Sequence, residues 1–170
     1  MRKQKGFSLI ELLIVVAIIL IIAAIAIPNL MRARMAANDS SAAASVRSIN
    51  TAEIAYFGAY PTLGYPIALA TLGGAAPCSP AIATGCIIDN SLATNGGGNG
   101  KSGYNFNATG SASAGGINDQ FYSTGTPFSA VTGTRAYCSI EDAALRLQAP
   151  GVITLVPTRA ACVLLTAMNN

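Results

Sequence analysis

An apolar run over residues 6–28, GFSLIELLIVVAIILIIAAIAIP, is the feature that most constrains this chain of 170 residues. The run contains no polar side chain from Leu12 to Ile27, and Glu11 is its only charged residue. As an α-helix at ~1.5 Å per residue, the stretch from Phe7 to Ile27 would span ~30 Å, the thickness of the hydrocarbon core of a bilayer. The run therefore predicts a membrane-spanning helix.

A short basic head precedes this run and sets its expected orientation. Arg2, Lys3 and Lys5 are positive and no acid accompanies them, which favours an N-terminus on the cytoplasmic side. A secretory signal peptide would carry its small-residue cleavage site after the apolar region, whereas Gly6 lies before it. Cleavage after Gly6 would leave the apolar helix on the product. The alternative is an ordinary membrane anchor in which Gly6 and Glu11 are incidental.

The sequence GFSLIE at residues 6–11, followed by the apolar run, resembles the prepilin motif of type IV pilins and of type II secretion pseudopilins. The resemblance in motif covers about the first third of the chain. It implies that a prepilin peptidase cuts after Gly6 and methylates the new N-terminus at Phe7. It also implies an assembly role for Glu11 and a helix kink at Pro28.

The expected role of Glu11 follows from its cost in lipid. A charged residue in a membrane helix costs roughly 2.5–3.5 kcal/mol, so a carboxylate there calls for a partner. The ammonium of Phe7 on a neighbouring subunit would neutralise Glu11 and would fix the axial stagger between the two subunits. Burial of the apolar faces at ~0.8 kcal/mol per CH₂ would then hold a filament core together.

The resemblance also implies partners and a location. The partners are identical subunits in a homopolymeric filament, a prepilin peptidase, an inner-membrane assembly platform and, before assembly, membrane lipid. The chain would reside in the inner membrane as a precursor and then in an extracellular or periplasmic filament. Residues 1–6 would be the leader that is removed, and residues 7–28 would form the transmembrane and assembly helix.

Composition argues against several other classes of protein. The chain is 52% hydrophobic and 10% charged, which is too apolar for a disordered protein. It has 10 basic and 7 acidic side chains, and removing the 3 basic residues of the leader leaves 7 against 7, so no basic surface remains for nucleic acid. With no His, the commonest acid–base group and metal ligand is absent. We expect neither an enzyme nor a bound cofactor or metal.

Four cysteines lie beyond the apolar run, at Cys78, Cys86, Cys138 and Cys162. In an oxidising compartment an even number of cysteines predicts disulfides, and three pairings are possible. We favour Cys78 with Cys86 and Cys138 with Cys162, because each pair would close a local loop. The second pair would resemble the disulfide-bounded C-terminal loop of many pilins. A zinc site is the rival interpretation, but the tight spacing of such sites is missing.

Residues 29–58 predict an amphipathic continuation of the helix. They are rich in Ala and carry an imperfect 3.6-residue apolar pattern. The charged side chains are expected on the other side of the helix, exposed to solvent or to neighbouring subunits; they are Arg32, Arg34, Asp39, Arg47 and Glu53. Gly58 and Pro61 predict the end of the helix, and residues 59–102 read as a long connecting loop.

Residues 103–170 predict an antiparallel sheet and a C-terminal disulfide loop. Gly and Pro turns separate the candidate strands, which lie at 103–109, 119–124, 134–140, 143–148 and 152–156. The sheet and the Ala-rich helix each need their apolar faces covered, and two packed layers would satisfy both. The predicted fold class is therefore α+β, with a long N-terminal helix packed against three to five antiparallel strands.

The functional hypothesis is a structural subunit of a type IV pilus. The cysteines favour a pilin over the alternative, the major pseudopilin of a type II secretion system. A second alternative is an enzyme or binding domain on a membrane anchor. Glu141 and Asp142 are the adjacent acids that such an enzyme could use, but we interpret them as a turn or strand edge.

Overall fold

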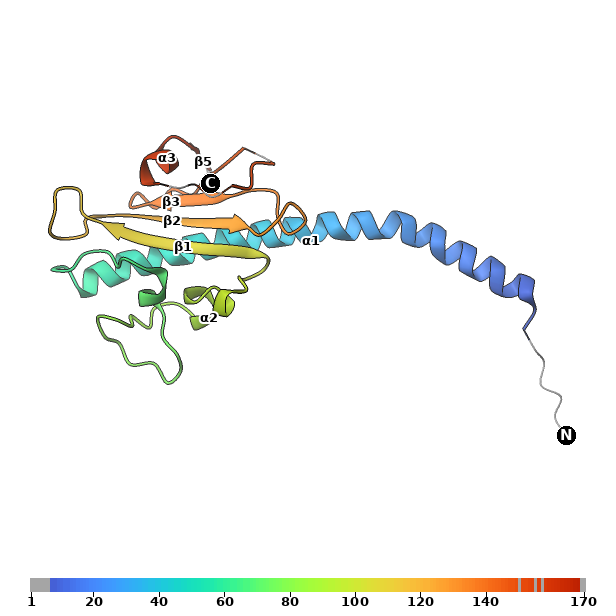
Figure 1. Ribbon diagram of the computed structural model, residues 1–170, viewed down its shortest axis with the longest axis horizontal. Coiled ribbons are helices and arrows are strands. Elements are labelled where there is room, and N and C mark those ends of the chain that lie inside the picture. Colours follow the sequence, from blue (N-terminus) through green and yellow to red (C-terminus); the bar gives the residue numbers. More distant parts are fainter. Residues whose placement is uncertain (1–6, 150, 155, 157, 169–170) are drawn as a thin grey trace. The chain divides into compact units, whose positions relative to one another are not determined.

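The computed structural model describes residues 7–149, 151–154, 156 and 158–168. Two compact units divide the chain, residues 1–34 and residues 35–170. The first unit holds the beginning of helix α1, and the second holds the rest of that helix and the sheet (Figure 1). The helices are α1 (Leu9–Ala59), the 3₁₀ helix η1 (Leu69–Leu72), α2 (Asn90–Ala93), the 3₁₀ helix η2 (Gly96–Gly98) and α3 (Arg159–Val163). The strands are β1 (Tyr104–Ser111), β2 (Gln120–Pro127), β3 (Tyr137–Ile140), β4 (Arg146–Leu147) and β5 (Thr166–Ala167).

The C-terminal half of α1 packs against the sheet through one buried stripe. Ala is the best helix former, which suits this Ala-rich segment, and apolar positions recur along it at helical spacing. The buried apolar residues of the stripe are Ala42, Ala43, Val46, Ile49, Ala52 and Tyr56. They form one hydrophobic cluster with Tyr104, Phe106 and Ala108 of β1. The predicted α+β architecture, with a long helix under an antiparallel sheet, is confirmed.

The sheet is a simple meander in which each strand pairs with its neighbours in sequence. The strand order is β1-β2-β3-β4-β5 and every pair is antiparallel. Along β1 buried and exposed side chains alternate, which is the period-2 pattern of a strand with one face on a core. Figure 1 shows β1, β2 and β3 lying along the C-terminal half of α1.

The long connection before the sheet is not merely a surface loop. Leu69 and Leu72 of η1 and Leu92 of α2 are buried in the main cluster. The loop is tied to β1 where Gly110 donates a backbone hydrogen bond to the carbonyl of Pro66 at 2.8 Å. A Cβ at Gly110 would lie 2.4 Å from the carbonyl oxygen of Tyr65, so this close approach requires glycine.

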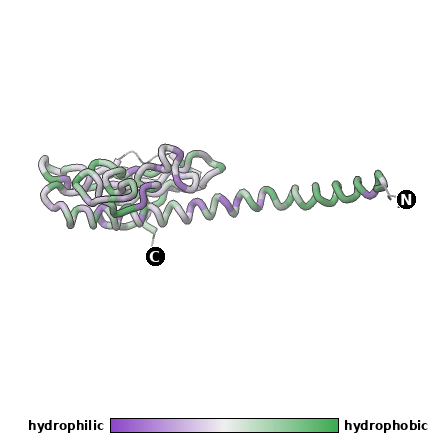
Figure 2. The backbone as a smooth tube through the Cα atoms, turned by 90° about the horizontal axis from the view of Figure 1, so that it is seen from below, coloured by the Kyte–Doolittle hydropathy of each residue, from purple (hydrophilic) through white to green (hydrophobic). Residues whose placement is uncertain are grey.

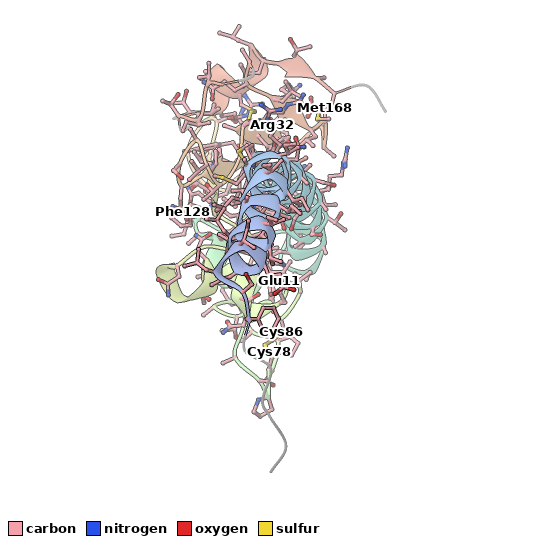
Figure 3. The ribbon with its side chains drawn as sticks, turned by 90° about the vertical axis from the view of Figure 1, so that its right-hand side faces the viewer. Glu11, Arg32, Cys78, Cys86, Phe128 and Met168 are labelled. Atoms are coloured by element: carbon pink, nitrogen blue, oxygen red, sulfur yellow. A yellow bond between two sulfur atoms is a disulfide. The ribbon has the colours of Figure 1, made fainter. Side chains whose placement is uncertain are left out.

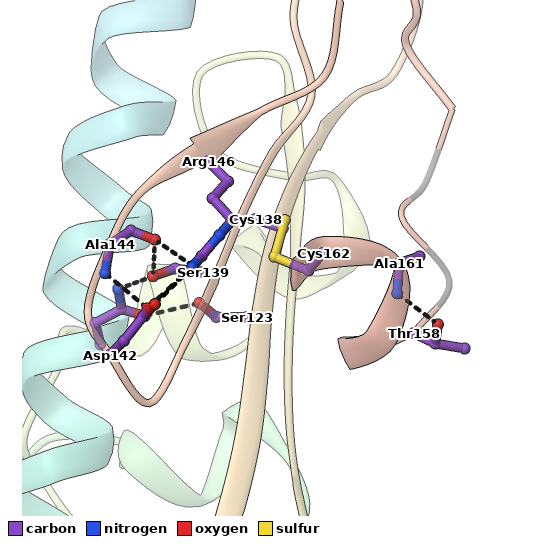
Figure 4. The surroundings of a disulfide bond; sticks show 10 residues. Ser123, Cys138, Ser139, Asp142, Ala144, Arg146, Thr158, Ala161 and Cys162 are labelled. Carbon is purple, nitrogen blue, oxygen red and sulfur yellow. Dashed lines mark hydrogen bonds and ion pairs between the residues drawn. A yellow bond between two sulfur atoms is a disulfide. The ribbon is translucent and has the colours of Figure 1, made fainter. Parts of the chain in front are cut away.

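Strand β3 is buried on both faces of the sheet. Tyr137 belongs to the main cluster with α1, whereas Cys138 and Ile140 form a second cluster with Val156 and Cys162. The disulfide from Cys138 to Cys162 joins β3 to α3 in this second cluster (Figure 4). The C-terminal segment therefore covers the face of β3 that α1 does not.

The second disulfide joins Cys78 to Cys86 in the loop before the sheet (Figure 3). Its two cysteines are 8 residues apart in the sequence, whereas those of the other disulfide are 24 residues apart. Both pairings are the ones that the sequence favours. No cysteine among the described residues is free.

One predicted strand is wrong, and one observed strand was not predicted. The expected strand at 152–156 is absent from its described part, residues 152–154 and 156. Pro150 and Pro157 flank this stretch, and a proline cannot donate a hydrogen bond to a ladder. The position next to β4 is taken instead by β5, where Thr166 and Ala167 pair with Leu147 and Arg146.

The prediction that Asp39 is exposed to solvent is also wrong. Its carboxylate is buried and accepts hydrogen bonds from the Tyr104 hydroxyl at 2.5 Å and from the Thr134 hydroxyl at 2.6 Å. The backbone N–H of Thr134 donates a third, at 3.0 Å. Several donors can stabilise a carboxylate away from water. Burial, together with the neighbouring Asp39, raises the pKa of the Tyr104 hydroxyl.

A second polar contact joins α1 to the sheet at Asn50, within the buried stripe. The Asn50 side chain donates to the Ser139 hydroxyl at 2.5 Å and accepts from the Ser123 hydroxyl at 2.8 Å. Ser139 in turn donates to the carbonyl of Ala144 at 2.8 Å (Figure 4). Because all three side chains are buried, this network specifies which turn of α1 faces β2 and β3.

Glu53 was expected on the exposed side and is instead fully buried, at 0% exposure. Neither carboxylate oxygen has a hydrogen-bond partner among the described residues. Burial raises the pKa of this carboxyl from 4.5 to about 8, because the charged form loses its hydration. Glu53 is therefore mainly protonated at neutral pH. Tyr56 and Tyr65 interact electrostatically with Glu53, and burial raises their pKa values as well.

We predict that the folded C-terminal unit loses stability as the pH rises from about 4.5 to about 8. The folded state holds the Glu53 proton more tightly than the unfolded state does, so stability is highest below the unfolded pKa and falls until the folded pKa is reached. Glu53→Gln is neutral at every pH and should remove this slope. Thermal unfolding of the full-length chain extracted from membranes, followed by circular dichroism across this pH range, measures the effect.

Asp119→Asn is the matched control for this experiment. Asp119 is exposed, and its hydrogen bonds from Ser113 lower its pKa, so its titration lies below the relevant range. The control should keep the slope of the wild type. Equal slopes in the wild type and Glu53→Gln would contradict the prediction.

The two disulfides should differ in their contribution to stability. A chain-entropy estimate for their sequence separations gives roughly 3.5 kcal/mol for Cys138–Cys162 and roughly 2.5 kcal/mol for Cys78–Cys86. The first pair is also fully buried, so its removal leaves a cavity. We expect the double Ala variant of Cys138 and Cys162 to lower the melting temperature more than the double Ala variant of Cys78 and Cys86. The reverse order in thermal unfolding would contradict this.

Candidate processing and assembly segment

Helix α1 begins at Leu9, directly after the residues that the sequence assigns to processing. Phe7 and Ser8 precede the helix, and the Phe7 side chain is 86% exposed. Gly6 and the rest of the leader lie outside the described residues. An exposed, non-helical Phe7 leaves the backbone at this position accessible to another protein.

Glu11 lies in the first turn of α1, where its carboxylate accepts a hydrogen bond from the backbone N–H of Ser8 at 3.2 Å. The first N–H groups of a helix have no partner within it, and the carboxylate supplies one. The spacing Ser8-x-x-Glu11 is that of a capping box, in which the acid at the third helical position accepts a hydrogen bond from the backbone N–H of the N-cap residue. The negative charge also lies at the positive end of the helix dipole. Sequence reasoning missed this cap, although the Ser-x-x-Glu spacing signals it.

The apolar side chains from Phe7 to Met31 are exposed in the isolated chain, except for Ala23, which is half-buried. Figure 2 shows this part of the backbone coloured almost continuously as hydrophobic. By length and composition, α1 is the one helix among the described residues that could cross a membrane. A surface of this size is not stable in water and requires cover from lipid or from other protein molecules.

Helix α1 continues without a break through Pro28. Proline has no N–H and removes one backbone hydrogen bond from the helix at this point. The kink expected at Pro28 stays a prediction. Directly after the apolar surface, Arg32 and Arg34 are exposed, and they have no ion pair among the described residues.

The two adjacent acids considered for catalysis are each held in an ion pair. Glu141 pairs with Arg159, and Asp142 accepts hydrogen bonds from the Arg146 guanidinium (Figure 4). The arginine hydrogen bond lowers the pKa of Asp142. These contacts hold the turn after β3 to β4 and to α3. Within the described part of the chain, no group of three His, Cys, Asp or Glu side chains could hold a metal ion.

Comparison with known proteins places the similarity at the N-terminus. Residues 1–27 match the family model of the prokaryotic N-terminal methylation motif. The chain is 68% identical over 40 residues to the type IV wide pilus major component PilA4 of Thermus thermophilus, covering 24% of this chain and 30% of that protein. It is 46% identical over 55 residues to the type IV major pilin protein PilA of Myxococcus xanthus, covering 32% of this chain and 25% of that protein.

These matches cover less than a third of the length of either relative, and no solved structure matches the chain. The family-model match over residues 1–27 includes Gly6, Phe7 and Glu11, the residues at which the sequence predicts processing and assembly. The N-terminal segment of this chain thus carries a prokaryotic N-terminal methylation motif and is similar to the corresponding segment of type IV pilins.

Proposed function

We propose that this chain is a structural subunit of a type IV pilus filament. The observation that carries the proposal is the exposed apolar half of α1, which begins with the methylation motif and resembles two pilus subunits. Residues 1–6 are the leader that a prepilin peptidase removes, and residues 7–28 anchor the precursor in the inner membrane. The mature chain then joins an extracellular filament of identical subunits with the help of the assembly platform.

Polymerisation places the apolar helices side by side and removes their surfaces from lipid. Leu, Ile and Val side chains contribute ~0.8 kcal/mol for each CH₂ that they bury, without fixing a direction or a register. A charge pair supplies the missing specificity. The Phe7 ammonium, once Gly6 is removed, pairs with Glu11 of a neighbouring subunit and selects one axial stagger.

The hydrogen bond between the Ser8 N–H and the Glu11 carboxylate must be compatible with the charge pair. In the isolated chain Glu11 already accepts one hydrogen bond, from the N–H of Ser8. A carboxylate has two oxygens and several acceptor positions, so it can keep this bond and still bind an ammonium group. Glu11 therefore performs two tasks, capping its own helix and pairing with the next subunit.

Processing at Gly6 is the first point to test. Replacing Gly6 by a bulky residue should leave full-length precursor in the membrane, because the peptidase site no longer fits. Mass spectrometry of the N-terminal peptide of purified filaments should find a methylated amine on Phe7 in the wild type. Assembled material that begins at Met1 would contradict this assignment.

Substitutions at Glu11 separate its two tasks. Glu11→Gln keeps an acceptor for the Ser8 N–H but removes the charge, whereas Glu11→Ala removes both. If the charge pair drives assembly, both variants should lose most of the filament, although both should insert into the membrane at least as well as the wild type. Glu11→Asp, which keeps the charge on a shorter side chain, should give an intermediate yield.

The readouts are sheared filament mass, electron microscopy and membrane content of the subunit, in a strain with no other copy. Wild-type filament yield from Glu11→Gln with a loss in Glu11→Ala would show that capping alone matters. Wild-type yield from Glu11→Ala would show that neither task is needed. Short filaments confined to the periplasm in the wild type would instead favour the pseudopilin alternative.

A further inference from the structure

Each acidic side chain of this chain is either buried or held by a hydrogen bond or ion pair, which leaves some of its basic side chains without a carboxylate. The sequence contains seven Asp and Glu residues. Two of them are buried, Asp39 among its donors and Glu53 without a partner among the described residues. The other five are held by hydrogen bonds or ion pairs, namely Glu11, Asp89, Asp119, Glu141 and Asp142.

Arg32 and Arg34 are the basic residues for which this matters most. Both are exposed, and neither forms an ion pair among the described residues. At ~100° per residue, positions two apart point to nearly opposite sides of a helix. The guanidinium groups of Arg32 and Arg34 therefore lie on nearly opposite sides of α1. We call these two residues the arginine collar.

The collar lies where the apolar surface of α1 ends. Leu30 and Met31 are still exposed, at 70% and 47%, and the charge begins at the next residue. When residues 7–27 span the ~30 Å hydrocarbon core, Arg32 and Arg34 follow Ile27 by ~7.5 Å and ~10.5 Å along the helix. Long Arg side chains reach back toward the interface, and a tilt of the helix shortens the distance further. The collar thus falls at the level of the lipid phosphates.

We propose that the arginine collar binds the phosphate groups of anionic phospholipids on the outer face of the inner membrane. Guanidinium groups bind phosphate oxygens in pairs of parallel hydrogen bonds, and each basic residue near an anionic surface contributes about 1 kcal/mol, or about fivefold in affinity. A second copy of this chain offers a poorer partner, because its carboxylates are buried, are bound to donors of their own chain or, at Glu11, pair with the Phe7 ammonium in the proposed filament. The collar would hold the membrane-inserted subunit at a fixed depth.

The inference rests on the membrane-inserted state of the proposed function and not on polymerisation. The test uses the full-length chain reconstituted in phosphatidylcholine vesicles that contain spin-labelled phosphatidylglycerol or spin-labelled phosphatidylcholine. Electron paramagnetic resonance measures the fraction of each lipid that the protein immobilises. Resistance to alkaline extraction is checked first, so that a failure to insert contradicts the proposed function and not the collar.

The wild type should select phosphatidylglycerol severalfold over phosphatidylcholine, and high salt should reduce the selectivity. The double variant Arg32→Gln/Arg34→Gln should lower the selectivity to the level that the basic leader alone gives, whereas Arg32→Lys/Arg34→Lys, which keeps the charge, should retain a large part of the difference. The double variant Lys101→Gln/Arg135→Gln is the matched control, since it removes two positive charges from the C-terminal unit and should leave the selectivity unchanged. The basic leader is common to every variant.

Two results would overturn the proposal. The first is wild-type lipid selectivity in Arg32→Gln/Arg34→Gln; if this variant also loses filaments in cells, the collar belongs to contacts between subunits. The second is the same loss of selectivity in the control variant as in Arg32→Gln/Arg34→Gln.

Discussion

The apolar surface over residues 7–31 cannot be covered by this chain itself, and that constraint governs the rest of the molecule. Each exposed Leu, Ile or Val there would gain ~1.5–3 kcal/mol from burial, so the sum over the segment is large compared with the net stability of a domain. Lipid and other copies of the same segment are both apolar enough to provide the cover. A chain of this kind can therefore move between the two environments at little cost in hydrophobic burial.

The C-terminal part of α1 is held by a different kind of interaction. Asp39 binds Tyr104 and Thr134, and Asn50 binds Ser123 and Ser139, all through buried hydrogen bonds. Such contacts have a direction and a fixed partner, and a helix cannot slide along the sheet without breaking them. The N-terminal half of α1 can thus be covered by any apolar surroundings, whereas its C-terminal half packs specifically against the sheet of its own chain.

The sequence predicts the long helix, the antiparallel sheet and the apolar segment, because each depends on a periodic pattern or on a specific motif. The cysteine pairs followed from loop length. The burial of Asp39 and Glu53 could not be predicted, because the sheet decides which face of the helix is covered. The donors to Asp39 also come from residues far along the chain. Strand β5 could not be predicted, because a strand of two residues is too short to show an alternating pattern. The hydrogen bond from the Ser8 N–H to the Glu11 carboxylate, by contrast, is local and is signalled by the Ser-x-x-Glu spacing.

The covalent link from Cys138 to Cys162 has a consequence for export. The sheet is a meander whose strands pair in the order in which they are made, so under the proposed function each strand can join the sheet as the subunit crosses the membrane. Cys162 follows all strands except β5, and thiols are oxidised only outside the reducing cytosol. The bond can close only when almost the whole sheet has been translocated. In the proposed exported subunit, a disulfide at this position therefore distinguishes a chain translocated at least as far as Cys162 from one that has stalled earlier.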